Sequence, residues 1–223
     1  MRTTMLNLAR ALSRGVVLPE PIYEFGARRV PGQEHRGHVR DVFRSRRFVG
    51  CDLQPGPGVD EVQDLQRLTL RDGVIGTALL FDTIEHVRKP WRAMAELERC
   101  LAPSGLVVMT SVMYFPIHAH PDDYWRFTES GFATLLEPFD RIAVRSYGLR
   151  KLPHTVVGIA SKRPTDPALA RAVGAALAAW EAHGARTWKE VAMAIAPPCL
   201  LVPAYDLFMW ALRRVGRGDG RPA

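Results

Sequence analysis

Short hydrophobic runs alternate with polar and helical segments through most of the chain. The runs at residues 21–26, 48–53, 74–81 and 106–112 are bounded by glycine, proline or charged residues, which is typical of buried parallel strands. The third run, residues 74–81, contains no charged residue and predicts a central strand. Residues 90–101 carry apolar side chains at helical spacing. Strands that alternate with helices predict a doubly wound α/β sheet with right-handed crossovers.

The remaining segments supply the connections and the closing part of this sheet. Residues 35–46 are predicted to form a helix that links the first two strands. Residues 128–137 predict a capped helix, and residues 140–148 and 155–162 predict a closing antiparallel pair of strands. The Ala-rich residues 168–185 predict a further helix beyond the sheet.

The pattern divides the chain into an N-terminal helix in residues 1–20, an α/β domain in residues 21–163 and a helical extension in residues 164–223. The first part has arginines where an export signal needs an apolar stretch. In the extension, residues 191–212 are largely apolar but hold three prolines and an aspartate. We expect this segment to pack on protein, with contact to a membrane surface or a spanning helix as alternatives.

The run at residues 48–53 brings the first candidate for chemistry, because it stops at Asp52-Leu53. In open α/β sheets, ligands bind at the carboxyl ends of the strands. One carboxylate there can accept hydrogen bonds from two neighbouring ribose hydroxyls, and Asp64 can face an adenine amine. The arrangement suggests an adenosine-containing cofactor, although many buried strands end in aspartate without binding one.

A second candidate lies at the end of the first run, in Glu24-Phe25-Gly26. A glycine at the exit of a strand lets the backbone approach a ligand closely, so that nearby amides can face it. We expect Glu24 to lie beneath this loop.

These motifs and several later ones occur in a characteristic order. They are Glu24-x-Gly26, Val49-Gly50-x-Asp52, Asp64-Leu65, Glu85-His86-Val87, Leu101-Ala102-Pro103-Ser104-Gly105-Leu106 and Asp123-Tyr124-Trp125-Arg126-Phe127-Thr128. The ordered set resembles a class I S-adenosylmethionine-dependent methyltransferase over about residues 20–162. The resemblance implies a Rossmann-like sheet of seven strands, S-adenosylmethionine (SAM) at its carboxyl edge, and methyl transfer to a nucleophile.

The resemblance also implies which residues bind the cofactor. They are Glu24, Gly26, Asp52, Leu53, Asp64, Leu65, Phe81 and His86. Asp52 would bind the ribose, Asp64 and Leu65 would bind the adenine, and Phe81 and the Glu85-His86 turn would line the methionine side. The chain departs from the family in the first loop, where Arg28 and Val30 replace the second and third glycines. A non-catalytic module that kept only the fold is therefore the alternative.

The segment after residues 106–112 gathers polar and aromatic side chains in one loop, which we expect to form the wall on the acceptor side. His118 or His120 could take a proton from a hydroxyl acceptor. The residues expected to contact the substrate are Asp123, Tyr124, Trp125 and Arg126, and Tyr124 and Trp125 could also shield the sulfonium. For each of them a purely structural role is the alternative.

The same loop contains His118-x-His120-x-Asp122, which resembles part of a metallo-hydrolase site. Such a site needs further ligands, and the other histidines show no supporting pattern. We therefore expect no metal, and a metal-dependent hydrolase is kept as a second alternative function.

The composition of the chain indicates where the protein works and which partners it binds. The 223 residues are 47% hydrophobic and 24% charged, as in ordinary globular proteins, and three widely separated cysteines suit a reducing, cytoplasmic location. The net charge is +7, but the arginines are scattered, so we expect no nucleic-acid partner. The acceptor is expected to be a small molecule or a saccharide precursor, with peripheral membrane contact through residues 191–212 as an option.

Overall fold

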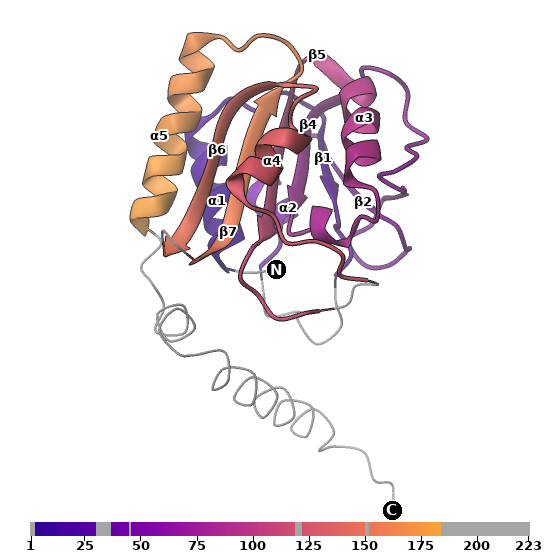
Figure 1. Ribbon diagram of the computed structural model, residues 1–223. Coiled ribbons are helices and arrows are strands. Elements are labelled where there is room, and N and C mark those ends of the chain that lie inside the picture. The colour runs from indigo at the N-terminus through magenta and orange to yellow at the C-terminus, as the bar shows by residue number, and fades with distance from the viewer. Residues whose placement is uncertain (1–2, 30–36, 45, 119–121, 150–151, 184–223) are drawn as a thin grey trace, which may run out of the picture. The chain divides into compact units, whose positions relative to one another are not determined.

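The computed structural model describes residues 3–29, 37–44, 46–118, 122–149 and 152–183 (Figure 1). His120 and the apolar segment at residues 191–212 lie outside these ranges, so the predictions that concern them stay predictions.

In the described part of the chain, seven strands form one sheet in the order β3-β2-β1-β4-β5-β7-β6. The strands are β1 (Ile22–Phe25), β2 (Phe48–Asp52), β3 (Glu61–Val62), β4 (Ile75–Phe81), β5 (Leu101–Val112), β6 (Asp140–Leu149) and β7 (Leu152–Ser161). The first five run parallel, and β7 is antiparallel to both β5 and β6. The predicted doubly wound sheet with a closing antiparallel pair is therefore confirmed.

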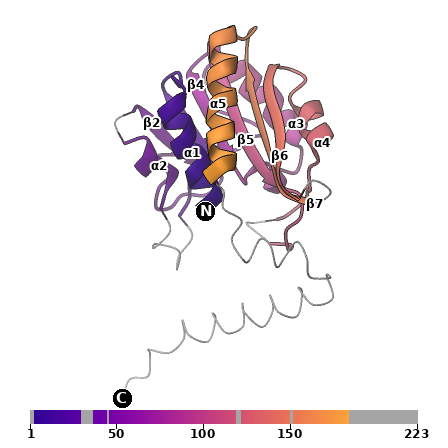
Figure 2. The ribbon, with the colours of Figure 1, turned by 90° about the vertical axis from the view of Figure 1, so that its left-hand side faces the viewer.

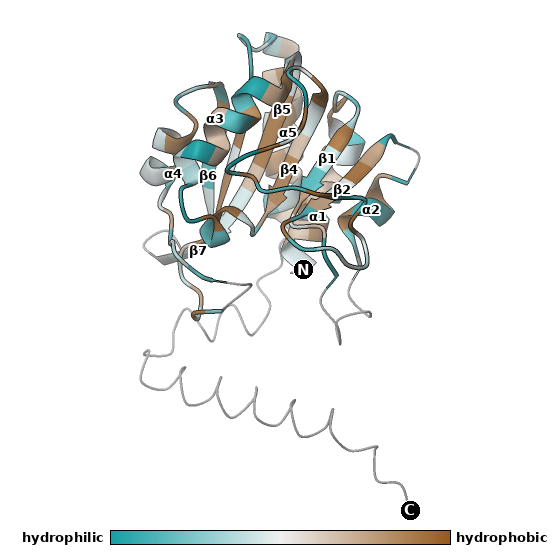
Figure 3. Ribbon diagram, turned by 90° about the vertical axis from the view of Figure 1, so that its right-hand side faces the viewer, coloured by the Kyte–Doolittle hydropathy of each residue, from teal (hydrophilic) through white to brown (hydrophobic). Residues whose placement is uncertain are grey.

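Strand β4 lies at the centre because its side chains are apolar on both faces, and all of them are buried. Ala78 and Leu80 belong to the core on one face, whereas Leu79 and Phe81 belong to the core on the other. Figure 3 shows the same division, with hydrophobic residues along the strands and hydrophilic residues on the outer helices and loops. Since successive residues of a strand point to opposite faces, a continuous apolar run serves two layers at once.

Helices cover both faces of the sheet. They are α1 (Thr3–Gly15), α2 (Val39–Val42), the 3-10 helix η1 (Ile84–His86), α3 (Pro90–Cys100), α4 (Glu129–Leu135) and α5 (Pro167–His183). Figure 1 shows α3 and α4 on one face, and Figure 2 shows α1 and α5 side by side on the other. None of the described helices is long and apolar enough to cross a membrane.

Local chemistry fixes where these helices begin and how they pack. Pro90 stands in the first turn of α3, where no backbone donor is needed. Thr128 caps α4 by accepting a hydrogen bond from the Gly131 amide at 3.1 Å, as predicted. On the opposite face, the Trp180 indole of α5 is buried and donates to the Thr4 carbonyl of α1 at 2.9 Å.

The division of the chain into three parts at residues 20 and 163 stays a prediction.

The helix predicted for residues 35–46 is wrong in its length, since the described residues hold only the single turn α2. His38 is extended, with φ −112° and ψ 152°, and makes no cap hydrogen bond with its side chain. After the turn, Phe43 is buried and stacks on Phe48 of β2 with ring centroids 6.2 Å apart. Burying Phe43 against β2 therefore decides the backbone path here, and tertiary packing overrides helical propensity.

Strand β5 also begins earlier than predicted, at Leu101 instead of residue 106. Its pairing with β4 shifts register between Ile75–Leu101 and Thr77–Leu106. Residues 102–105, whose sequence is typical of a turn, therefore form an irregularity within strand β5.

Candidate functional site

The parallel strands bring their carboxyl ends to one edge of the sheet. Phe25 of β1 pairs with Cys51 of β2, and Phe81 of β4 pairs with Thr110 of β5. The strand order reverses between β1 and β4, the place where α/β sheets bind ligands. The loops that follow these strands form the candidate site.

Gly26 turns the chain at the end of β1 and is required there for two reasons. Its φ of 88° lies in the left-handed region, and a Cβ at this position would stand 2.6 Å from the Thr83 hydroxyl oxygen. The Gly26 and Ala27 amides both donate to the Cys51 carbonyl, at 2.9 and 3.0 Å. The backbone therefore passes closely over the end of β2, and these two amides are directed at Cys51. The expected close approach of this loop to a ligand stays a prediction.

Asp52 ends β2, and its half-buried carboxylate faces the loop after β1. Oδ2 accepts from the Arg28 amide at 3.2 Å, and Oδ1 accepts from the Gln54 amide at 3.1 Å. An ionised carboxylate has about four acceptor positions, so two amides leave capacity for two hydroxyl groups. Leu53 next to it is 52% exposed, an unusual position for leucine and one that could contact a flat ring.

Asp64 and Leu65 follow β3 on the same side of the sheet. Oδ1 of Asp64 accepts from the Gln66 amide at 2.8 Å and from its side-chain amide at 3.3 Å. The Leu65 side chain is buried in the core, so only its backbone is placed to meet a ligand. A role of these two residues in adenine binding stays a prediction.

Arg28, which stands at a position that is glycine in the resembling family, links the two loops. Its guanidinium donates to the Gln54 side-chain oxygen at 2.8 Å and lies against Gly56, where a Cβ would stand 3.0 Å from Arg28 Nε. The Arg29 amide donates to the Pro57 carbonyl at 2.9 Å. These hydrogen bonds hold the loop after β1 against the loop after β2. Val30, the other residue that replaces a glycine, lies outside the described residues.

Glu24 is the second-to-last residue of β1 and is half-buried. Burial raises the pKa of its carboxyl to about 8, and the positive charges of Arg40 and Arg29 only partly oppose this. The carboxyl is therefore mainly protonated at pH 7, so that it can donate as well as accept a hydrogen bond.

The turn after β4 is held in an unusual backbone conformation. Asp82 has a φ of 51°, and its Oδ1 accepts from the Thr110 hydroxyl of β5 at 3.0 Å. Phe81 before it is buried. Glu85 in η1 is completely buried, and its Oε2 accepts from the Ser111 hydroxyl at 2.9 Å. Strain of this kind at a ligand-binding edge is often stored for function.

His86 and His118 meet across two loops, with ring centroids 4.8 Å apart and the rings nearly perpendicular. His86 Nδ1 lies 2.5 Å from the Asp122 carbonyl oxygen. His118 Nδ1 lies 3.1 Å from Asp123 Oδ2, whereas the His118 amide donates to the same oxygen at 2.8 Å. Burial lowers the pKa of His118, with Asp123 opposing the effect, so the ring is mainly neutral at pH 7.

Asp123 and Arg126 form an ion pair beneath this loop. The Asp123 side chain is 2% exposed and accepts from Arg126 at 2.5 and 2.7 Å. Burial alone would raise the pKa of Asp123, but hydrogen bonds from Arg126 and the His118 amide hold it at about 2. The two side chains therefore bind each other. Their contact with a substrate stays a prediction.

The aromatic residues of the loop differ in exposure. Tyr124 is 43% exposed, and its hydroxyl donates to Asp122 Oδ2 at 2.7 Å. The Trp125 indole donates to the Val87 carbonyl at 3.0 Å and meets Trp91 edge to face. The Tyr124 ring is therefore partly open to solvent, whereas Trp125 anchors the loop to the residue that follows η1, and the predicted substrate contacts of both residues stay predictions. The proposed metallo-hydrolase pattern requires His120, which lies outside the described residues.

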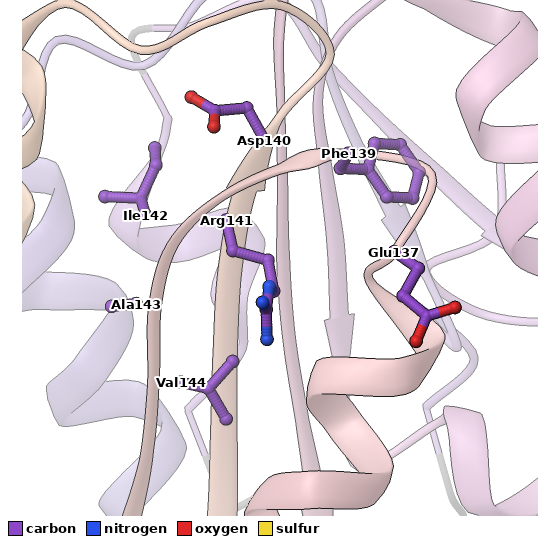
Figure 4. Close-up of a pocket in the computed structure, with 7 residues that line it drawn as sticks. All are labelled: Glu137, Phe139, Asp140, Arg141, Ile142, Ala143 and Val144. Atoms are coloured by element: carbon purple, nitrogen blue, oxygen red, sulfur yellow. The ribbon is translucent and has the colours of Figure 1, made fainter.

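A separate hollow of about 460 Å³ lies where α4 leads into β6 (Figure 4). Residues 137 and 139–144 line it. Because Asp140 and Leu106 both pair with Ser161, the start of β6 lies level with Leu106 of β5, which pairs with Thr77 near the start of β4. The hollow is therefore at the edge opposite to the carboxyl ends of the strands, and it contains none of the predicted site residues.

Sequence reasoning missed two features of this edge. Glu85 was expected only as part of the Glu85-His86 turn on the methionine side, and neither its complete burial nor its hydrogen bond from Ser111 was predicted. Because β4 and β5 are neighbours, the loops that follow them must be adjacent, which would have brought Glu85, His86 and His118 together.

Comparisons with known proteins agree with this architecture. Residues 38–109 match the family model described as a methyltransferase domain. The fold resembles a 1,6-didemethyltoxoflavin-N1-methyltransferase from Burkholderia thailandensis, crystallised with 1,6-didemethyltoxoflavin and S-adenosylhomocysteine. The TM-score is 0.57 and the identity 19%, over 73% of this chain and 79% of that chain. No curated protein matches the chain in sequence.

Two further solved structures show the same likeness. A putative methyltransferase from Bacillus halodurans has a TM-score of 0.53 and 12% identity, over 70% of this chain and 99% of that chain. A SAM-dependent methyltransferase from Mesorhizobium loti has a TM-score of 0.52 and 15% identity, over 71% of this chain and 98% of that chain. At these identities the likeness establishes the fold.

Proposed function

Since the chain has the fold of the class I SAM-dependent methyltransferases and a central segment that matches a methyltransferase-domain model, we propose that it transfers a methyl group from SAM to a small-molecule acceptor. The observation that carries the proposal is Asp52. It is a carboxylate at the carboxyl end of β2, with acceptor capacity left after two backbone amides have bound it.

The cofactor would occupy the edge from β3 to β4. Asp52 would accept from both ribose hydroxyls, and the exposed Leu53 side chain would contact the adenine beside Asp64. Glu24, Gly26, Phe81 and His86 would surround the methionine part. SAM supplies a methyl group bonded to a positive sulfur, and the protein's task is to align the acceptor opposite that bond.

The acceptor would lie against the loop after β5. In this proposal a mainly neutral ring of His118 takes the proton of a hydroxyl acceptor, and His120 is a second candidate for the same task. The solved structure from B. thailandensis holds 1,6-didemethyltoxoflavin together with S-adenosylhomocysteine, which supports a small-molecule acceptor. A saccharide precursor fits the same reasoning.

Calorimetric titration of the full-length protein with SAM tests the proposal. Asp52→Ala should weaken binding by roughly 10- to 100-fold, because two charge-assisted hydrogen bonds to the ribose are lost. Asp41→Ala is a suitable control, since Asp41 is exposed on α2 and forms an ion pair with its neighbour Arg44. The proposal fails if the intact protein shows no saturable binding of SAM.

A second candidate function is a binding module that has lost the cofactor, and the Arg28 side chain is the observation that favours it. Its hydrogen bond to Gln54 fastens together the two loops between which the adenosine would enter. Arg28→Gly separates the candidates. Binding of SAM by the Arg28→Gly variant but not by the wild type would support the module, whereas binding by the wild type would exclude it.

A further inference from the structure

Glu85, His86 and His118 form a cluster of possible metal ligands at the carboxyl edge of the sheet. One carboxylate oxygen and one ring nitrogen from each histidine lie within 4.8 Å of one another. Glu85 and His86 come from η1 after β4, and His118 comes from the loop after β5. The ligand atoms of one zinc ion lie roughly 3 to 4 Å apart, given metal–ligand distances of about 2.0 to 2.2 Å. An approach of about 1 Å would therefore close the site.

The hydrogen bonds of the two histidines prepare both rings for coordination. A carbonyl oxygen only accepts, so His86 Nδ1, at 2.5 Å from the Asp122 carbonyl, must carry the proton. His118 Nδ1 lies near two acceptors, Asp123 Oδ2 at 3.1 Å and the Pro116 carbonyl at 3.2 Å, and so carries a proton as well. In the neutral form of each ring, the lone pair is then on Nε2. This arrangement, with Nδ1 donating to a carbonyl or carboxylate, is the one that orients histidines on metals.

Further hydrogen bonds hold Asp123, which contacts His118, and the Glu85 carboxylate in place. Asp123 is held by two hydrogen bonds from Arg126, and Glu85 Oε2 is held by the Ser111 hydroxyl. The Glu85 carboxylate is completely buried, and a divalent cation would offset the cost of keeping it ionised. A supported carboxylate and two oriented imidazoles are the ligand set of open catalytic zinc sites.

We propose that Glu85, His86 and His118 bind a divalent transition metal ion of the zinc type. Mixed nitrogen and oxygen ligands suit Zn²⁺, Mn²⁺ or Fe²⁺ better than Mg²⁺ or Ca²⁺, which prefer oxygen alone. This differs from the sequence-based expectation of no metal, because the fold adds Glu85 and His86 to His118. Three protein ligands leave at least one position on the ion open.

The use of that open position rests on the proposed function. A hydroxyl oxygen of the acceptor would bind the ion and release its proton to water. The oxygen would then form a bond to the methyl carbon, while the carbon–sulfur bond breaks and its electron pair stays on sulfur. In this arrangement His118 holds the ion and does not take the acceptor's proton.

Titration of untagged, chelator-treated full-length protein with Zn²⁺, followed by calorimetry, tests the site. About one ion should bind, and His86→Gln and His118→Gln should each weaken binding at least 10-fold. His38→Gln is the matched control, because His38 is a half-buried histidine in a different part of the fold, next to α2. Zn²⁺ should also raise the melting temperature of the wild type and of His38→Gln but not of the other two variants.

The proposal is overturned if the wild type binds no Zn²⁺, or if both cluster variants bind it as tightly as the wild type does. Circular dichroism on each variant establishes that it is folded before it is compared. A parallel titration with SAM keeps the two proposals apart. Zinc binding without SAM binding would support the metal site and contradict the methyltransferase, and the reverse result would do the opposite.

Discussion

Replacing Glu24 with glutamine should stabilise the protein at alkaline pH and leave its stability nearly unchanged at acidic pH. Burial in β1 raises the pKa of the Glu24 carboxyl from its ordinary value of 4.5 to about 8. Below pH 4.5, the group is protonated in both the folded and the unfolded chain. Between 4.5 and about 8, the unfolded chain releases the proton while the folded chain keeps it. Stability that is present at low pH is therefore lost as the pH rises through this interval.

The size of the effect follows from the same interval. One pKa unit corresponds to about 1.4 kcal/mol, so the interval from 4.5 to about 8 sets an upper limit of about 5 kcal/mol. The side chain keeps some contact with water, and part of this penalty is relieved by solvent. We expect Glu24→Gln to exceed the wild type by roughly 2 to 3 kcal/mol above pH 8 and to match it near pH 5.

Urea unfolding followed by tryptophan fluorescence, at about pH 5, 6.5 and 8.5, measures the difference. Glu20→Gln is a control of opposite sign, because the Arg47 amide and the Arg46 side chain lower the pKa of Glu20. That variant should lose stability, relative to the wild type, above the ordinary pKa of glutamate. If Glu24→Gln and the wild type show equal stability at all three pH values, the Glu24 carboxyl is not desolvated and our account of it is wrong.

Two further substitutions, each compared with a control variant, test the packing of the site. Gly50→Ala should lower the free energy of unfolding by about 1 to 3 kcal/mol, because its Cβ would stand 2.2 Å from the Gly58 carbonyl oxygen. Gly174→Ala, with open space around it in α5, should be neutral or slightly stabilising by the same urea assay. Asp123→Asn should cost about 3 kcal/mol at pH 7, because it leaves Arg126 without its buried partner, and the exposed Asp122→Asn should cost far less. Equal melting temperatures for these last two variants would contradict the importance of the ion pair.

The parts of the fold that sequence could predict are those in which local pattern and burial agree. An uncharged, mostly apolar run favours a buried element, and β4 lies at the centre of the sheet with all of its residues buried. The positions of Asp52 and Gly26 were predictable because a parallel strand has a defined carboxyl end, and residues at that end lie at the edge where α/β sheets bind ligands.

The parts that sequence could not predict depend on contacts between distant segments. Val39 and Phe43 have helical spacing, yet α2 is one turn long because Phe43 turns to stack on Phe48. The order of β4 and β5 predicts that the loops with His86 and His118 are neighbours, but the ring contact itself depends on the path of the loop after β5, which no periodicity specifies. Arg28 could be recognised as a departure from glycine, but its bond to Gln54 depends on how two loops meet.

Three carboxyl groups near the ends of neighbouring strands show how one sheet edge separates chemical roles by solvation. Asp52 is half-buried and meets two backbone amides, which suits a group that accepts hydrogen bonds from hydroxyls. Glu24 is protonated near pH 7, because its burial is not matched by the nearby arginines. Glu85 is completely buried and held by Ser111, so that a cation is the partner that best suits its ionised form. In our proposals, environment rather than residue type would assign Asp52 to ribose binding, Glu24 to a neutral hydrogen-bonding position and Glu85 to metal binding. A different measurement tests each of these proposals: SAM affinity, stability against pH, and zinc affinity.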